Sequence, residues 1–356
     1  SRSRNENQGV DSVNILIVNA SDETVTPNSV KGGNQLLTEK LHEELTKRTD
    51  HRVDLELLRF DDTNPINLYR SYQRAIKYDA SKYDAVISMK FPSFCVSHDK
   101  HLCLFNHRMK QFYSEWSKFH GSDGITKPVY QKIRDIIHRV DTEALSQTTI
   151  LAQSEHIAKR LKQQELYAEV VNPPPTMQNL KTKEYDYFLL PSRLEDKNKR
   201  ISLAIQAFNK AETDANLIIT GDGPDKTRLE RLAGPNISFT GFVPDEELRG
   251  LYGEARAVLF TGEDEDYGLT TIEAMKASKP VVTTSDSGGP LEFVENRRTG
   301  FVTEPEKSNL ARVLSFLDAH REVCEHLGHT ARSAVQHIGW EAYVPRIEVF
   351  LESETL

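Results

Sequence analysis

The segment from residue 257 to residue 290 constrains the fold of this chain more than any other part of the sequence. Residues 257–260 form a short apolar run that is typical of a buried strand. An acidic loop, a helical pattern over residues 270–277, a second apolar run over residues 280–284 and the pair Gly288 and Gly289 follow in that order. Strand, loop, helix and strand in succession are the repeating unit of a parallel α/β sheet. Ligands of such sheets bind beyond the carboxyl ends of the strands, where we expect the acidic and glycine loops to lie.

Two glutamates in this segment have the spacing of a ligand-binding pair. Glu265 and Glu273 are separated by seven residues, and a bend at Gly268 would aim both side chains at one small polyol. Carboxylates accept hydrogen bonds from neighbouring hydroxyl groups, so a sugar or a ribose is the expected ligand. A second interpretation fits Glu273 as well, because residues 270–273 read TTIE, a capping box in which the glutamate bonds back to the start of its own helix. The pair alone leaves both interpretations open.

The sequence around the pair, EDYGLTTIEAMKASKPVV followed by DSGGPLEFV, resembles the donor-site signature of the family 4 glycosyltransferases. The resemblance extends over nearly the whole chain. It implies an α/β protein of the GT-B fold, with two facing Rossmann-like domains and a cleft between them. By the same resemblance Glu273 holds the nucleotide ribose, Glu265 contacts the donor sugar, and Tyr267, Gly268 and Leu269 belong to the donor site. The implied reaction moves a sugar from a nucleotide diphosphate sugar to an acceptor hydroxyl, with retention at the anomeric carbon.

The resemblance also assigns the cations that bind the donor diphosphate. Residues 187–191 are expected to form a strand, and Arg193 and Lys199 follow it in the order of the arginine and lysine of the family. Lys197 competes with Lys199 for this role because the loop is rich in lysine. Two cations suit a leaving group that departs with negative charge, so no metal ion or other cofactor is expected. The family's contacts with the nucleotide extend the expected donor site to Gly241, Val243 and Leu248.

In the first half of the chain two features have a possible role in the donor site. Gly32 and Gly33 precede a helix predicted over residues 34–48, where backbone N–H groups can face an anion. The family places this glycine pair next to the donor phosphates; it is not a GxGxxG fingerprint, which argues against a classical NAD site. His107 follows a short predicted strand and precedes a helix expected over residues 109–119. The resemblance implies a role for His107 near the donor sugar, and a purely structural histidine is the alternative.

Prolines divide the chain into two predicted domains. Residues 173–175 are all proline, and such a stiff run is typical of a linker. We therefore expect an acceptor-side domain over residues 1–172 and a donor-binding domain over residues 173–338. The last helix, over residues 339–356, is expected to pack back on the first domain.

Charge and cysteine usage limit the classes of partner and location. The chain has 356 residues and a net charge of −8, which argues against a general nucleic-acid binder. Residues 68–140 nevertheless carry 13 Lys and Arg against 6 Asp and Glu. This basic region fits either a solvated face or contact with an anionic membrane surface. The three cysteines have no metal-like spacing, the polar start has no apolar signal region, and no apolar run is long enough to span a membrane. These features predict a cytoplasmic protein, and the basic region adds peripheral contact at the inner face of the membrane. The start also lacks a methionine, which indicates an added segment or a cut from a longer chain.

Two rival functions remain open from the sequence. The first is a sugar-nucleotide epimerase on the same fold, and the second is a non-catalytic module that binds a nucleotide sugar within a larger assembly. The hypothesis that we carry forward is a retaining glycosyltransferase with a glycan or lipid-linked acceptor, acting in the synthesis of cell-surface glycan, polysaccharide or glycolipid.

Overall fold

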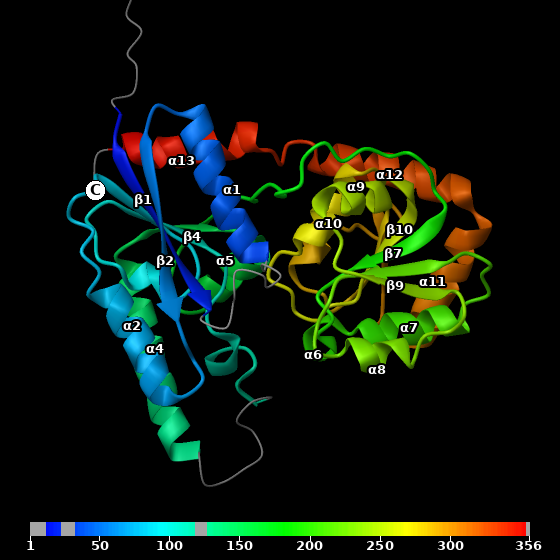
Figure 1. Cartoon of the computed structure of the whole chain (residues 1–356), viewed down its shortest axis with the longest axis horizontal. Coiled ribbons are helices and arrows are strands. Elements are labelled where there is room, and N and C mark those ends of the chain that lie inside the picture. The colour runs from blue at the N-terminus through cyan, green and yellow to red at the C-terminus, as the bar shows by residue number, and fades with distance from the viewer. Residues whose placement is uncertain (1–11, 23–32, 118–126, 354–356) are drawn as a thin grey trace, which may run out of the picture. The chain divides into compact units, whose positions relative to one another are not determined.

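The computed structural model describes residues 12–22, 33–117 and 127–353. The chain divides into two compact units, each built on a parallel six-stranded sheet with helices around it (Figure 1). We call Ser1–Gln153, Arg160–Val171 and Trp340–Leu356 the N-terminal unit. The C-terminal unit comprises Ser154–Lys159 and Asn172–Gly339.

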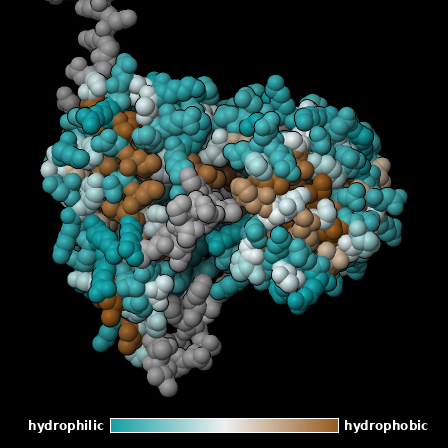
Figure 2. Space-filling view, viewed as in Figure 1, coloured by the Kyte–Doolittle hydropathy of each residue, from teal (hydrophilic) through white to brown (hydrophobic). Residues whose placement is uncertain are grey.

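The sheet of the N-terminal unit has the strand order β2-β1-β3-β4-β5-β6. Its strands are β1 (Asn14–Asp22), β2 (Arg52–Phe60), β3 (Ala85–Ser88), β4 (His101–Phe105), β5 (Thr149–Ala152) and β6 (Glu169–Val170). Strands in the middle of a parallel sheet are covered on both faces, and this explains why residues 15–18 are apolar without interruption and fully buried. On the surface of this unit the hydrophilic cover is interrupted by apolar side chains over β1 and β2 (Figure 2).

The helices of the N-terminal unit that lie wholly within the described residues are α1 (Gly33–Arg48), α2 (Pro65–Ile76), α4 (Lys127–Ser146), α13 (Trp340–Glu352) and the later part of α5 (Glu155–Lys162). Leu37, Leu41 and Leu45 repeat every four residues along α1 and are buried on one face. The final helix α13 packs on the same core, because its Trp340 and Ile347 join the cluster around β1.

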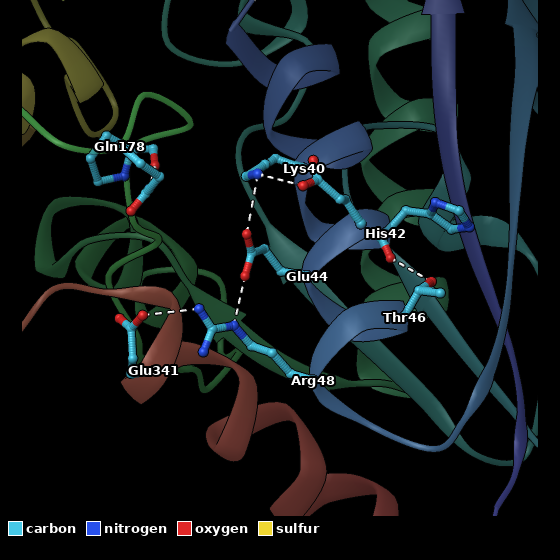
Figure 3. A network of polar contacts seen from close by, with 9 residues as sticks. Lys40, His42, Glu44, Thr46, Arg48, Gln178 and Glu341 are labelled. Carbon is cyan, nitrogen blue, oxygen red and sulfur yellow. Dashed lines mark hydrogen bonds and ion pairs between the residues drawn. The ribbon is translucent and has the colours of Figure 1, made fainter.

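Ion pairs on the surface of α1 reinforce the contact with α13. Glu44 is nearly buried and lies 3.1 Å from Nζ of Lys40 and 2.6 Å from Nε of Arg48. Arg48 in turn contacts Glu341 of α13 at 2.9 Å (Figure 3). The last described helix is thus joined to the first by both apolar packing and charge.

The sheet of the C-terminal unit has the strand order β12-β11-β10-β7-β8-β9. Its strands are β7 (Tyr187–Pro191), β8 (Leu217–Thr220), β9 (Ile237–Gly241), β10 (Ala255–Phe260), β11 (Val281–Thr284) and β12 (Gly300–Thr303). Its helices are α6 (Asp196–Lys199), α7 (Ile201–Lys210), α8 (Lys226–Glu230), α9 (Asp245–Glu254), α10 (Leu269–Lys276), α11 (Lys307–Ala319) and α12 (Arg321–Val335).

Two apolar clusters cover the two faces of this second sheet. Ala257 and Leu259 of β10 pack in the cluster that contains α7 and α11. Val258 and Phe260 pack in the cluster that contains α9, α10 and α12. The alternation follows from the two-residue period of a strand, and the burial of both faces fixes β10 at the centre of the sheet.

The helix expected over residues 109–119 is wrong over residues 109–115. The structure has a 3-10 turn, Lys110–Phe112, and Tyr113 leaves helical geometry with φ −121° and ψ −104°, so that α-helical residues begin only at 116–117, where this described range ends. The carbonyl of Phe112 accepts hydrogen bonds from Arg134 and His138 of α4 instead of continuing a helix. Tertiary bonds to α4 therefore override the local helical pattern.

Candidate active site

The acidic loop and the glycine loop of the C-terminal unit meet beyond the carboxyl ends of β10 and β11. The backbone N–H of Glu265 donates to the carbonyl of Ser287 at 2.9 Å, and the N–H of Gly289 donates to the carbonyl of Glu265 at 2.7 Å. Gly288 has φ 81°, and a Cβ at this position would lie 2.5 Å from the carbonyl oxygen of Glu265. A glycine is therefore required for the two loops to form one continuous surface.

The structure brings Lys199 and Glu265 together on this surface. Lys199 is the last residue of α6, and its Nζ donates to Oε2 of Glu265. The two side chains are 32% and 25% exposed, so the pair is open to a ligand while partly shielded from water. Lys197, the competing candidate of the same short helix, is exposed.

Glu273 lies in the second turn of α10, and its carboxylate is held from a neighbouring helix. The hydroxyl of the buried Tyr252 on α9 donates to Oε2 of Glu273 at 2.7 Å. Burial raises the pKa of Glu273 to about 7, although the hydrogen bond from Tyr252 acts in the opposite direction. The half-buried carboxyl group thus titrates in the physiological range.

The capping-box interpretation of Glu273 is wrong. The helix begins at Leu269, and the residue at its N-cap is Gly268, with φ 82°. The carboxylate that would cap the helix binds Tyr252 instead. Gly268 supplies the left-handed turn between the acidic loop and α10, in a conformation that side chains rarely adopt.

The other expected donor-site residues of this unit lie at separate points of the same sheet edge. Arg193 follows β7, is 72% exposed and has its Nε 3.6 Å from the carboxylate of Glu195. Gly241 ends β9 with φ 74°, Val243 is buried and Leu248 is half-buried in α9. The structure does not join Arg193 to the glutamate pair in the part of the chain that it describes.

The two residues beside Gly268 contribute to packing. Tyr267 is buried, and its hydroxyl donates to the carbonyl of Pro173 at 2.8 Å. Leu269 packs against the apolar cluster under α10. Both side chains therefore stabilise the loop around Gly268 by packing and, for Tyr267, by a hydrogen bond.

The expected residues of the N-terminal unit lie on that unit's own elements. Gly33 is the first residue of α1 and is exposed, whereas Gly32 lies outside the described residues. His107 follows β4 by two residues, is half-buried and has its ring 5.4 Å from the ring of Phe91.

Residues that the sequence reasoning missed anchor the acidic loop. Oγ of Ser154 donates to the carbonyl of Asp266 at 2.6 Å, and Nε2 of His156 lies 3.0 Å from Oδ1 of Asp264. The carboxylate of Glu292 accepts from the backbone N–H of His156 at 2.7 Å. The first turn of α5 thus fixes both the acidic loop and the segment after Gly289. Ser154 immediately before a helical pattern was a capping signal, but its partner Asp266 is 112 residues away.

Arg200 was also missed and ties the ends of two strands together. Its guanidinium donates to the carbonyl of Thr261 at 2.7 Å, to Thr284 at 2.9 Å and to the carboxylate of Asp286 at 2.7 and 2.8 Å. These bonds hold the bases of the acidic and glycine loops at a fixed separation.

Among the described residues, no cluster of three or more His, Cys, Asp or Glu has the arrangement of a metal site. No helix in the described ranges has the length and apolar character needed to cross a membrane.

Known proteins are similar in sequence mainly to the second half of the chain. The family model described as glycosyl transferases group 1 matches residues 176–334. A GDP-mannose-dependent alpha-(1-6)-phosphatidylinositol dimannoside mannosyltransferase of Mycobacterium tuberculosis is 40% identical over 86 residues, which cover 24% of this chain and 23% of that protein. The human alpha-1,3/1,6-mannosyltransferase ALG2 is 25% identical over 40% of this chain and 39% of its own. These matches thus span less than half the length of the curated relatives.

Solved structures match almost the whole fold. The sucrose-phosphate synthase of Thermosynechococcus elongatus is 17% identical and covers 95% of this chain and 100% of its own, with a TM-score of 0.77. Anabaena HepE in complex with UDP and glucose is 16% identical, covers 96% and 100%, and has a TM-score of 0.71. The expected GT-B fold is confirmed. Residues 176–334 are therefore similar to the glycosyl transferases group 1, and the chain has the fold of the solved GT-B structures that it matches.

Proposed function

We propose that this chain is a retaining glycosyltransferase of family 4, which moves a sugar from a nucleotide diphosphate sugar to an acceptor hydroxyl. The observation that carries the proposal is the pairing of Lys199 with Glu265 in the loop after β10, with the carboxylate of Glu273 in the helix α10 that follows this loop. This segment supplies two carboxylates, one of them paired with a cation and the other bound by the hydroxyl of Tyr252. A nucleotide diphosphate sugar presents the complementary groups, namely phosphate oxygens and two sets of vicinal hydroxyls.

Each side chain has a distinct part in the proposed reaction. Glu273 accepts hydrogen bonds from the ribose hydroxyls, and Glu265 accepts them from hydroxyls of the transferred sugar. Lys199 turns from Glu265 to the diphosphate, where Arg193 joins it, and the two cations stabilise the charge that develops on the leaving group. His107 acts near the reacting sugar. Neither a metal ion nor a protein nucleophile has a part in this reaction.

The names of similar proteins support this choice of donor and acceptor. The mycobacterial relative is named for GDP-mannose, and HepE was solved with UDP and glucose. Two relatives are named for lipid acceptors: that mannosyltransferase and an alpha-monoglucosyldiacylglycerol synthase of Acholeplasma laidlawii. We accordingly assign the chain to the synthesis of a cell-surface glycan, polysaccharide or glycolipid.

A peripheral position at the inner face of the membrane fits such an acceptor. The basic region of residues 68–140 includes apolar side chains that point to solvent, among them Tyr69 at 63%, Val129 at 59% and Ile136 at 57% exposure. Basic and apolar side chains together bind anionic lipid surfaces. The free, buried Cys95, Cys103 and Cys324 fit a reducing compartment such as the cytoplasm.

The proposal is tested by incubating the protein with radiolabelled UDP-, GDP- and ADP-sugars, with and without lipid extract as acceptor. A glycosyltransferase converts one donor to a labelled product and free nucleotide, and nuclear magnetic resonance of that product shows the anomeric configuration of the donor. Conversion to an epimeric nucleotide sugar, or binding of every donor without turnover, would contradict the proposal.

A further inference from the structure

An arginine in the N-terminal unit is buried without the partners that such a side chain requires. Arg108 lies three residues after β4 and is 7% exposed. Its guanidinium lies over the ring of Tyr113, with Cζ 4.9 Å from the ring centroid, and its Nη1 donates to Oε1 of Gln164. Within the described part of the chain, Nε and Nη2 of Arg108 have no hydrogen-bond partner.

The nearby carboxylate does not supply the missing acceptor. Asp141 of α4 is fully buried, but its two oxygens accept from the hydroxyl of Tyr72 on the neighbouring helix α2, at 2.9 Å, and from that of Tyr113, at 2.8 Å. Tyr113 therefore lies between the two charges: its ring contacts the guanidinium and its hydroxyl contacts Asp141. A buried charge whose donors are unsatisfied is costly, so a specific reason is needed for its presence.

The unsatisfied atoms have the geometry of a binding site for an oxyanion. Nε and Nη2 form one edge of the planar guanidinium, and this edge binds a carboxylate or a phosphate through two parallel hydrogen bonds. We propose that this edge of Arg108 binds an anionic group, a phosphate or a carboxylate, of the acceptor substrate. The identification of the ligand as the acceptor rests on the proposed function.

The position of Arg108 agrees with this role. It follows His107 at the carboxyl edge of the N-terminal sheet, which is the edge where parallel α/β sheets bind ligands. Its one hydrogen-bonded partner among the described residues, Gln164, is exposed in the turn after α5. The side-chain amide of Gln164 can therefore leave the guanidinium by rotating into solvent when a ligand binds.

Titration of two simple anions tests the proposal directly. Inorganic phosphate and malonate are titrated by calorimetry into the wild-type protein, Arg108→Gln, Arg108→Lys and Arg139→Gln, an exposed arginine of α4 that serves as the control. We expect at least one anion to bind the wild type and Arg139→Gln equally, and to bind Arg108→Gln at least tenfold more weakly. Arg108→Lys retains the charge but not the two-donor edge, so it should recover only part of the affinity.

A second set of measurements distinguishes an anion site at Arg108 from a purely structural arginine and from anion binding at Lys199. Lys199→Ala, which alters only the proposed donor site, should keep the Arg108-dependent binding. Because the guanidinium edge is unsatisfied in the free protein, Arg108→Gln should melt at or above the wild-type temperature, whereas loss of a structural arginine would lower it.

Donor hydrolysis separates failure of this inference from failure of the proposed function. Hydrolysis of the donor in water should remain near wild type in Arg108→Gln, and its absence in the wild type would count against the proposed function instead. Anion binding that is lost in Lys199→Ala and kept in Arg108→Gln, or absent from the wild type, would overturn the inference.

Discussion

At the scale of single residues, the ionisation of Glu273 links the site to pH. Burial raises the pKa of this carboxyl to about 7 from its ordinary 4.5. In the proposed donor site, ribose hydroxyls donate to the ionised carboxylate of Glu273, so we expect nucleotide binding to require its deprotonation. The affinity for nucleotide diphosphate should be highest above pH 7 and should fall roughly tenfold per pH unit below it, down to the lower pKa of the complex.

Calorimetric titrations between pH 5.5 and 8 measure this dependence. Glu273→Gln is the control, because it keeps the titration of the nucleotide phosphates and removes that of the side chain. An identical pH dependence in both proteins would exclude Glu273 as its source. The stability of the fold depends on pH in the opposite direction, because burial favours the neutral form of Glu273. Its contribution to the free energy of unfolding is fully present below pH 4.5 and is lost as the pH rises through 7.

Lys199 supplies a second prediction at this scale. Lys199→Ala removes the cation that we assign to the diphosphate, and a loss of this kind typically lowers turnover about 10²-fold. Lys197→Ala is a matched control, because Lys197 lies in the same helix and is exposed. Initial rates with the preferred donor decide between them, and full activity in Lys199→Ala would move the role to Lys197.

At the scale of elements, the pairing of α1 with α13 depends on Glu44. Burial by itself raises the pKa of Glu44, but hydrogen bonds from Arg48 and Lys40 outweigh it and hold the pKa below its ordinary value. Glu44→Ala should therefore lower the free energy of unfolding by about 1–3 kcal/mol, as measured by urea denaturation. Glu43→Ala, which removes a 60% exposed carboxylate that also pairs with Lys40, should change it by less than about 0.5 kcal/mol.

The pH dependence provides an independent check on Glu44. Because the pKa of Glu44 is depressed in the folded protein, its stabilising contribution is present above the ordinary value of 4.5 and is lost as the pH falls through the folded value. The difference in stability between wild type and Glu44→Ala should thus shrink in acid. A difference that stays constant down to pH 3 would show that packing rather than charge is responsible.

The sequence predicts best the strands that are buried on both faces of a sheet. Residues 15–18 and 257–260 are apolar in succession because both faces of a central parallel strand are covered, and this pattern needs no tertiary information. The helix expected over residues 109–119 does not form over residues 109–115, where bonds from α4 to the carbonyl of Phe112 replace it. Local periodicity carries no signal for such contacts.

For the candidate site, the sequence indicated residue types but not the contacts that those residues make. The spacing of Glu265 and Glu273 indicated a polyol site, but the pairing of Glu273 with Tyr252 joins two different helices and has no signature in the sequence. The bond between Glu292 and the backbone of His156 spans 136 residues and was equally invisible. Buried polar groups find partners by tertiary packing, and sequence spacing specifies those partners only within one helix or turn.

At the scale of the whole molecule, the basic region predicts salt-sensitive membrane association. Vesicles containing anionic phospholipid should cosediment with the protein at low salt, and neutral phosphatidylcholine vesicles should not. Exposed charges are screened over about 8 Å at physiological salt, so binding should weaken as salt is added. Arg139→Glu on α4 should weaken it further. No cosedimentation with anionic vesicles at low salt would exclude the proposed membrane contact.

The central claim is that Glu273 binds the nucleotide and Glu265 binds the transferred sugar. Titration of Glu273→Gln and Glu265→Gln with free nucleotide diphosphate and with the intact donor tests it most directly. Glutamine cannot accept hydrogen bonds with both side-chain ends, so Glu273→Gln should lose about 1.5–3 kcal/mol, roughly 10- to 150-fold, in affinity for the nucleotide alone. Glu265→Gln should bind the nucleotide like the wild type while turnover of the donor falls. Unchanged nucleotide affinity in both variants would contradict the claim and leave the donor site without an assigned ribose contact.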